Sequence, residues 1–280
     1  MDVKAGRLIT YEQLTAELGT ADVIYIGEEH RNRSHIEAAL RILRTLLERG
    51  RLPTMALEMF GWDGQAGLDR YLVDPAASKG QLLLDAHWKQ NWAGPYEDYE
   101  PFIGFAREHH VPVLALNPPK PLVRRVAREG LVRARSDPEM SRWGMREEPL
   151  DDEPVYRGLI LKQLRSCHGG LSEDTYQRMY DAALFRDEGM AKIISNYLNH
   201  LTPGAGPLVS YTGGGHIQYG VPVPSRVLRR QHAPIRQTTI YLSALEPGHA
   251  EDVQDMIRKS IADYLWLTPL SASGPAPRCI

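Results

Sequence analysis

The stretch Val23-Ile24-Tyr25-Ile26-Gly27-Glu28-Glu29-His30 decides the fold class. Its first four residues form a short apolar run of the kind that a buried strand requires. Gly27 bounds this strand, and apolar residues then recur at helical spacing from Ile36 to Leu47, before Gly50. The stretch therefore predicts a strand, a turn and a helix, which is the repeating unit of an α/β protein.

Similar apolar runs recur along the chain and predict further strands at residues 55–60, 111–116, 208–212 and 238–242. Segments with apolar residues at helical spacing lie between several of these predicted strands. Strands that alternate with helices pair in parallel, and helices then cover both faces of the sheet. We expect an α/β fold with a mainly parallel central sheet flanked by helices.

Strand patterns are absent between residues 121 and 201, where helical periodicity dominates after Ser172, a plausible N-cap. We therefore expect an inserted helical subdomain at residues 121–201. Residues 1–120 and 202–270 are expected to form the α/β sheet domain. Residues 271–280 are rich in small residues and proline, which predicts a flexible tail.

Composition excludes some classes of function. The chain has 280 residues, with 33 Lys and Arg against 35 Asp and Glu, so its charge gives no reason to expect nucleic-acid binding. Two cysteines offer neither a zinc ribbon nor a disulfide framework. No apolar run approaches the roughly 18 residues of a membrane span, so membrane anchoring is not supported. The compartment stays open: cytoplasmic for the sequence as it stands, or periplasmic lipoprotein if its start was trimmed.

Polar residues follow several predicted strands, and the carboxyl ends of parallel strands meet at one edge of a sheet. Two motifs of the form Gly-x-x-His, at residues 27–30 and 213–216, would each bring a histidine to this edge. We expect the catalytic candidates to converge there, and they are Glu28, Glu29, His30, Glu58 and His216. Glycine lets backbone amides approach a ligand closely, so the candidate cofactor-binding residues are Gly27, Gly213, Gly214, Gly215 and Asn117.

Two imidazoles and a carboxylate form a ligand set that suits a divalent transition metal. The candidate metal ligands are His30, Glu58 and His216. Glu28 or Glu29 could be a further ligand or the general base that activates a metal-bound water. Each residue alone has a structural alternative; Glu58, for example, could simply pair with an arginine.

Several longer motifs together resemble the ChaN family, from about Val3 to the strand near Tyr241. These motifs are Ile26-Gly27-Glu28-Glu29-His30, Leu57-Glu58-Met59-Phe60, Tyr99-Glu100-Pro101-Phe102, Ala115-Leu116-Asn117, Asp187-Glu188-Gly189-Met190-Ala191, and Gly215-His216-Ile217-Gln218-Tyr219-Gly220-Val221-Pro222. The resemblance implies a sheet domain with a helical subdomain, and haem binding linked to iron uptake. It further implies a homodimer that holds haem between its subunits, and a tyrosine ligand that the sequence does not single out.

The resemblance extends to the wider TIKI and erythromycin-esterase-like group. In that group, similar Gly-x-x-His and Glu positions are associated with metal-dependent peptidase or hydrolase chemistry. Two functions are therefore expected. The first is a haem-binding protein that handles haem or iron, with haem or another small molecule as its ligand. The alternative is a divalent-metal-dependent hydrolase or peptidase-like enzyme that uses the paired Gly-x-x-His site. Whether the protein is an enzyme stays open at this stage.

Overall fold

A computed structural model describes residues 1–92, 94–201 and 205–270. Within these residues, six parallel strands form one sheet in the order β3-β2-β4-β1-β5-β6. The strands are β1 (Val23–Glu28), β2 (Thr54–Gly61), β3 (Val113–Asn117), β4 (Leu208–Gly213), β5 (Gln237–Leu245) and β6 (Tyr264–Pro269). The predicted α/β fold with a parallel sheet is confirmed. The edge strand β6 was not predicted.

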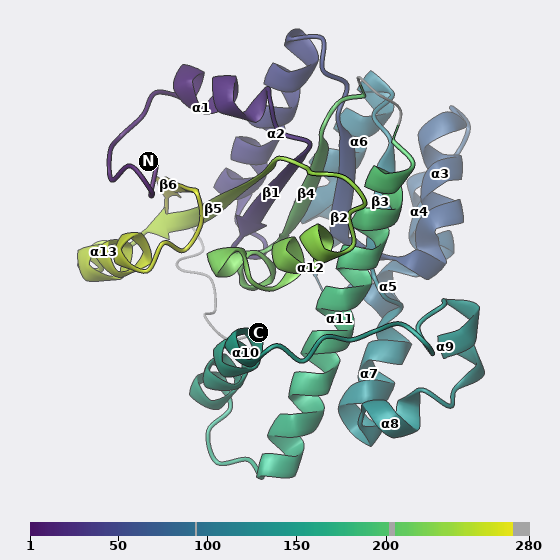
Figure 1. Ribbon diagram of the computed structural model, residues 1–280. Coiled ribbons are helices and arrows are strands. Elements are labelled where there is room, and N and C mark those ends of the chain that lie inside the picture. The colour runs from purple at the N-terminus through teal and green to yellow at the C-terminus, as the bar shows by residue number, and fades with distance from the viewer. Residues whose placement is uncertain (93, 202–204, 271–280) are drawn as a thin grey trace.

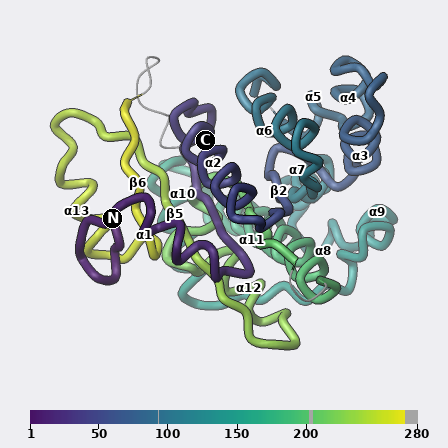
Figure 2. The backbone as a smooth tube through the Cα atoms, turned by 90° about the horizontal axis from the view of Figure 1, so that it is seen from above, coloured from purple at the N-terminus to yellow at the C-terminus, as the bar shows by residue number. Residues whose placement is uncertain are grey.

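Helices connect the strands and cover both faces of the sheet (Figure 1). Between β1 and β3 they are α2 (Arg33–Glu48), α3 (Gln65–Val73), α4 (Lys79–Asp85), α5 (Trp88–Asn91) and α6 (Tyr96–His109), with the short 3-10 helix η1 (Trp62–Gly64). α1 (Tyr11–Leu18) precedes β1. After β4 come η2 (Gly214–His216), η3 (Gln218–Gly220), α12 (Val223–Arg229) and α13 (Ala250–Arg258). Figure 2 shows α13 and β6 on the side of the molecule opposite α3 and α4.

The described residues between β3 and β4 contain helices and no strand. These helices are α7 (Lys120–Glu129), α8 (Leu131–Ala134), α9 (Pro138–Arg142), α10 (Pro154–Cys167) and α11 (Glu173–Asn199). Ser172 caps α11 by accepting a hydrogen bond from the Thr175 amide. Figure 1 shows α11 running from the sheet down to α7 and α10. The division into a sheet domain and a separate subdomain stays a prediction, and the predicted tail at 271–280 lies outside the described residues.

The two faces of the sheet bury different side chains of the same strands. Ile24 and Ile26 of β1 pack on one face in a cluster with residues of α2 and α6. Val23 and Tyr25 pack on the other face with residues of α11 and α12. This alternation follows from the two-residue period of a strand. Both faces of β1 are buried, which explains why its sequence is a continuous apolar run.

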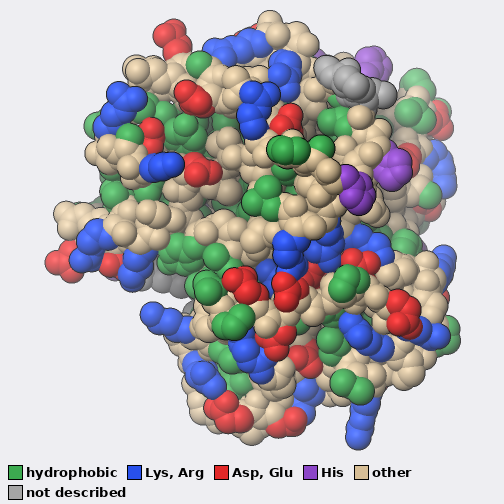
Figure 3. Space-filling model, in the orientation of Figure 1, with side chains coloured by type: hydrophobic (Ala, Val, Ile, Leu, Met, Phe, Trp, Pro, Cys, Tyr) green, Lys and Arg blue, Asp and Glu red, His purple; other side chains and the backbone are tan. Residues whose placement is uncertain are grey.

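A cluster of ion pairs fixes α12 against α11. Glu188 lies in the buried middle of α11 and pairs with Arg226, Arg229 and Arg230. In the view of Figure 3, basic and acidic side chains lie together across the middle of this face, where Figure 1 shows α12. None of the helices in the described part of the chain is long and apolar enough to cross a membrane.

Candidate functional site

The candidate site lies at the carboxyl ends of β1 and β4, which are neighbours at the centre of the sheet. After β1 the chain continues into α2 on one face, and after β4 it continues toward α12 on the other. Connections that leave adjacent parallel strands in opposite directions open a crevice between them. A cavity of about 590 Å³ lies here, and its lining includes Glu28, Glu29, His30, Glu58, Gly213 and His216.

His216 and Asp187 form a close pair on the floor of the cavity. The imidazole Nδ1 of His216 lies 2.5 Å from the Asp187 carboxylate, and the Tyr156 hydroxyl donates to the other carboxylate oxygen at 2.6 Å. Burial by itself would lower the pKa of His216, but the carboxylates of Glu58 and Asp187 raise it to about 9. Asp187 therefore orients the ring and favours its protonated form.

Glu58 is the central hydrogen-bond acceptor among the polar residues that line this part of the cavity. Its Oε1 accepts from Arg186 at 2.5 Å, and its Oε2 accepts from the Gly213 amide at 2.7 Å. Asn117 does not line the cavity; its side chain donates to the Glu58 backbone carbonyl at 2.8 Å. Burial would raise the pKa of Glu58, but the positive charges of His216, His30 and Arg186 hold it well below the usual range. Glu58 is therefore a buried carboxylate anion.

A second histidine and carboxylate pair follows β1. His30 Nδ1 lies 2.9 Å from Glu28 Oε1. Glu28 also accepts from the Tyr99 hydroxyl at 2.9 Å and from the Tyr211 hydroxyl at 2.6 Å. Burial raises the pKa of Glu28 despite these donors. Burial alone would lower the pKa of His30, yet Glu28 and Glu58 together raise this pKa above its ordinary value. Two imidazoles, each held by a carboxylate, thus face one cavity and could exchange protons with a bound molecule.

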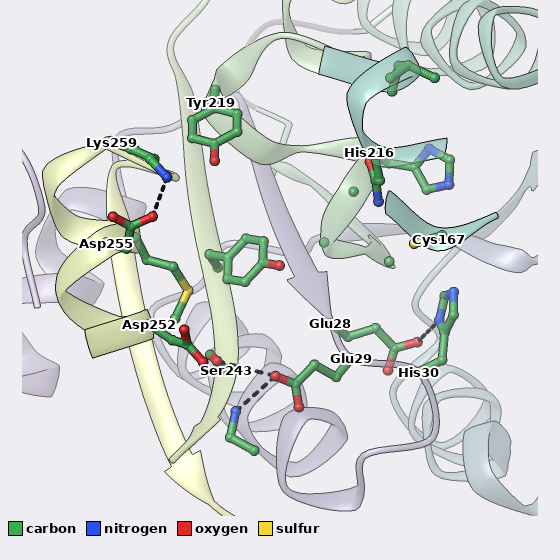
Figure 4. Close-up of a pocket in the computed structure, with 18 of the residues that line it drawn as sticks. Glu28, Glu29, His30, Cys167, His216, Tyr219, Ser243, Asp252, Asp255 and Lys259 are labelled. Atoms are coloured by element: carbon green, nitrogen blue, oxygen red, sulfur yellow. Dashed lines mark hydrogen bonds and ion pairs between the residues drawn. The ribbon is translucent and has the colours of Figure 1, made fainter. Parts of the chain in front are cut away.

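Glu29 differs from Glu28 in that it holds the strand ends together. Its carboxylate accepts from the Ser243 hydroxyl and the Ala244 amide, each at 3.2 Å, so it ties the turn after β1 to β5. Figure 4 shows Glu29 pointing toward Ser243, and Glu28 toward His30. Gly27 is closely surrounded, since a Cβ there would lie 2.9 Å from the Gly214 backbone. A cofactor-binding role for Gly27, Gly213, Gly214, Gly215 and Asn117 stays a prediction.

His35 lies on α2 behind the site and is fully buried. Its Nδ1 accepts from the Glu29 amide at 3.0 Å, so its proton sits on Nε2, for which no hydrogen-bond partner occurs among the described residues. Burial lowers the pKa of His35 to about 4. The ring is therefore neutral at pH 7 and supports the turn that carries Glu29.

This burial predicts a loss of stability in acid. His35 binds a proton near pH 6.5 when unfolded and near pH 4 when folded. Between these values the unfolded chain holds more protons, so the free energy of unfolding should fall by up to about 1.4 kcal/mol for each pH unit lowered. His35→Gln should reduce this slope between pH 6.5 and pH 4, as measured by urea unfolding. Parallel pH curves for the two proteins would rule out the assignment.

No group of three or more His, Cys, Asp or Glu side chains in the described ranges is arranged to hold a metal ion. The position of Arg186 keeps these side chains from converging on a metal ion, because its Nη2 lies between Glu58, at 2.5 Å, and His216 Nε2, at 3.1 Å. The guanidinium supplies the positive charge that a metal ion would supply. Metal ligation by His30, Glu58 and His216 stays a prediction, and the arginine partner considered for Glu58 is present.

Several residues of the site were not assigned to it from sequence, although Tyr99 and Asp187 belong to the motifs that resemble ChaN. Arg186 and Asp187 come from the middle of α11, and the buried hydroxyls come from Tyr99, Tyr156 and Tyr211. One signal was available: Arg186, Asp187 and Glu188 are three consecutive charged residues within an otherwise apolar helical pattern. Such charges are buried only when they are paired.

The sequence model of the family described as "Haem-binding uptake, Tiki superfamily, ChaN" matches residues 14–227. The chain belongs to this family. The fold is similar to that of ChaN of Campylobacter jejuni, a protein described as binding heme cofacially. The TM-score is 0.70 at 18% identity, with 95% of this chain and 94% of that chain covered. This similarity supports the fold, and the ChaN resemblance noted in the sequence is confirmed.

Two further proteins are similar to this chain. An erythromycin esterase mutant, EreC H289N in its open conformation, has a TM-score of 0.51 at 15% identity, with 88% of this chain and 78% of that chain covered. The Arabidopsis thaliana protein RETICULATA-RELATED 5, chloroplastic, is 27% identical over 94% of this chain. The ChaN-family chain spans only 36% of the length of that plant protein.

Proposed function

We propose that this protein binds haem in the cavity at the ends of β1 and β4 and takes part in haem or iron handling. The match of residues 14–227 to the haem-binding ChaN family carries this proposal. The cofacial heme binding described for ChaN of Campylobacter jejuni supports it. A hydrolase that depends on a divalent metal is not favoured, because Arg186 already occupies the space between Glu58 and His216.

The cavity has a tyrosine suited to haem iron. Tyrosine is one of the protein ligands of haem iron, and Tyr219 and Tyr241 both line the cavity. Tyr219 follows the second Gly-x-x-His motif and is 37% exposed. Tyr241 instead packs against Gly214, the first residue of η2, since a Cβ on Gly214 would lie 2.6 Å from its ring. Tyr219 is thus the more exposed of the two tyrosines, and we propose that it would be the protein ligand of the haem iron.

The walls of the cavity suit a flat apolar ring. Ile160 and Leu164 of α10 line one wall, and Val253 and Met256 of α13 line another. Aliphatic side chains of this kind can cover a porphyrin and exclude water from it. Haem, once bound, would supply an iron centre with ligand-binding and redox chemistry. His30 and His216 would then hold protons at the polar end of the same cavity.

Absorption spectroscopy tests this function directly. We expect added hemin to give a Soret band that shifts and saturates at a defined stoichiometry. Tyr219→Phe should weaken hemin binding at least about tenfold, which corresponds to roughly 1.4 kcal/mol, because the ring keeps its shape but loses its ligand oxygen. Tyr241→Phe is the matched control and should bind hemin like the unmodified protein. Circular dichroism would verify that both variants are folded.

The outcomes of this experiment separate two claims. If the unmodified protein shows no saturable hemin band, the haem function is wrong. If hemin binds and Tyr219→Phe binds equally well, the function stands and the ligand assignment is wrong. The expected homodimer, the role in iron uptake and the cellular compartment stay predictions.

A further inference from the structure

Two permanently charged cations, Arg186 and Lys259, are present among the described residues that line the cavity. They lie in different environments. Arg186 is at the polar floor, where it donates to the buried Glu58 carboxylate at 2.5 Å and to Asn117 at 3.4 Å. A carboxylate of a ligand would have to compete with Glu58, which is only 1% exposed and cannot turn into solvent. Arg186 is therefore not available to bind a carboxylate of the ligand.

Lys259 is held much more loosely. It follows the last residue of α13 and pairs with Asp255, four residues earlier on the same helix. The Lys259 side chain is 55% exposed and that of Asp255 is 40% exposed. Ion pairs this exposed contribute little, and both partners can rotate into water. A carboxylate that arrives in the cavity can therefore replace Asp255 at the ammonium group.

The backbone places Lys259 beside Tyr219. The amide of Tyr219 donates to the carbonyl of Ile261 at 2.6 Å, so the turn after α13 is fastened to the segment that carries the tyrosine. Ser260, inside this turn, has a left-handed backbone with φ of 51°. Asp255, and to a smaller extent the negative charge of an ionised Tyr219 hydroxyl, raise the pKa of Lys259, so the two side chains lie close enough to influence each other. Figure 4 shows both on the same side of the cavity, across from Glu28 and His30.

The remaining charges on this wall are mainly acidic. Glu246, Asp252 and Asp255 line the cavity near Lys259, together with His249. Like charges would repel a ligand carboxylate from most of this wall, so the ammonium of Lys259 marks the position where one can bind. A hydrogen bond between two charged groups would also fix the orientation of the ligand.

We propose that Lys259 binds a carboxylate of the ligand, so that the cavity selects porphyrins that carry free propionate groups. This inference rests on the proposed haem binding and adds the chemical class of ligand to it. Tyr219 would hold the iron at the centre of the ring, while Lys259 would hold a propionate at its edge. Lys259 is thus a specificity-determining residue of the cavity.

The test compares hemin with hemin dimethyl ester, which has the same iron and ring but no free carboxylate. We expect the unmodified protein to bind hemin at least about tenfold more tightly than the ester. Lys259→Met should weaken hemin binding by about the same factor and leave ester binding unchanged, which removes the preference. Lys259→Arg should keep the preference, and Asp255→Asn should bind hemin at least as tightly as the unmodified protein.

Each outcome separates this inference from the proposed function. If neither compound saturates the unmodified protein, haem binding itself is wrong. If both bind with equal affinity, or if Lys259→Met keeps the full preference for hemin, haem binding stands and the role of Lys259 is overturned. Unfolding of a variant would be seen by circular dichroism, and because Lys259 is exposed we expect none.

Discussion

Glu58→Leu is expected to lower the free energy of unfolding by about 3–5 kcal/mol, the usual cost of removing one partner from a buried ion pair. The Glu58 carboxylate binds the Arg186 guanidinium and the Gly213 amide and lies 3.4 Å from the His216 ring. Leucine fills a similar volume but accepts no hydrogen bond. The Gly213 amide would be left unpaired at the end of β4, and Arg186 and His216 would lose the anion that lies between them.

Urea unfolding at pH 7 measures this loss, and Glu58→Gln is the matched control. Glutamine keeps an oxygen that can accept from Gly213 or Arg186, so it removes the charge but retains hydrogen-bonding capacity. We expect glutamine to cost clearly less than leucine. If Glu58→Leu stays within about 1 kcal/mol of the unmodified protein, the network at the strand ends is not what stabilises this edge of the sheet.

The predicted strands were recognisable from sequence because a parallel strand is buried on both faces. Val23-Ile24-Tyr25-Ile26 is apolar at every position, since one set of side chains faces α2 and the other faces α11. Gly27 and Gly213 lie at or next to the last residue of β1 and β4, and both are still buried. The positions of Glu28, His30, Glu58 and His216 near one another follow from this topology.

The edge strand β6 could not be predicted from its own sequence pattern. The segment Tyr264–Pro269 is an edge strand in which exposed and buried residues are mixed, and its last residue is proline. Its place in the sheet depends on pairing with β5, from Ile240 opposite Tyr264 to Leu245 opposite Pro269. Short strands of this kind are defined by distant partners rather than by their own pattern.

The charges that α11 supplies around His216 could not be assigned from sequence for a related reason. Arg186 lies 128 residues from its partner Glu58, and Asp187 lies 29 residues from His216. The path of α11 across the sheet brings them together, and helical periodicity does not specify that path. Sequence therefore indicated which strand ends meet, but not which helix would supply the opposing charges.

Arg226→Met is expected to lower the free energy of unfolding by about 3–5 kcal/mol. The Arg226 side chain is only 1% exposed and lies between α12 and α11. Its guanidinium donates to Glu188 at 3.0 Å and to the Pro222 carbonyl at 2.8 Å, and it stacks over the Tyr156 ring at 3.8 Å. Methionine preserves an unbranched apolar chain but removes the fully buried cation among the three that pair with Glu188, and with it the donor to the Pro222 carbonyl.

Arg229→Met is the matched control, because Arg229 donates to the same Glu188 oxygen at 3.1 Å from the same helix. Its side chain is 39% exposed, so its loss should cost at most about 1 kcal/mol. Urea unfolding of both variants would distinguish how much the buried contacts and the positive charge each contribute to the free energy of unfolding. Equal losses would mean that net charge near Glu188, rather than the buried contacts of Arg226, holds α12 in place. A larger loss for Arg226 would show that its buried contacts hold α12 in place; one of them is to the ring of Tyr156, whose hydroxyl donates to Asp187, the partner of His216.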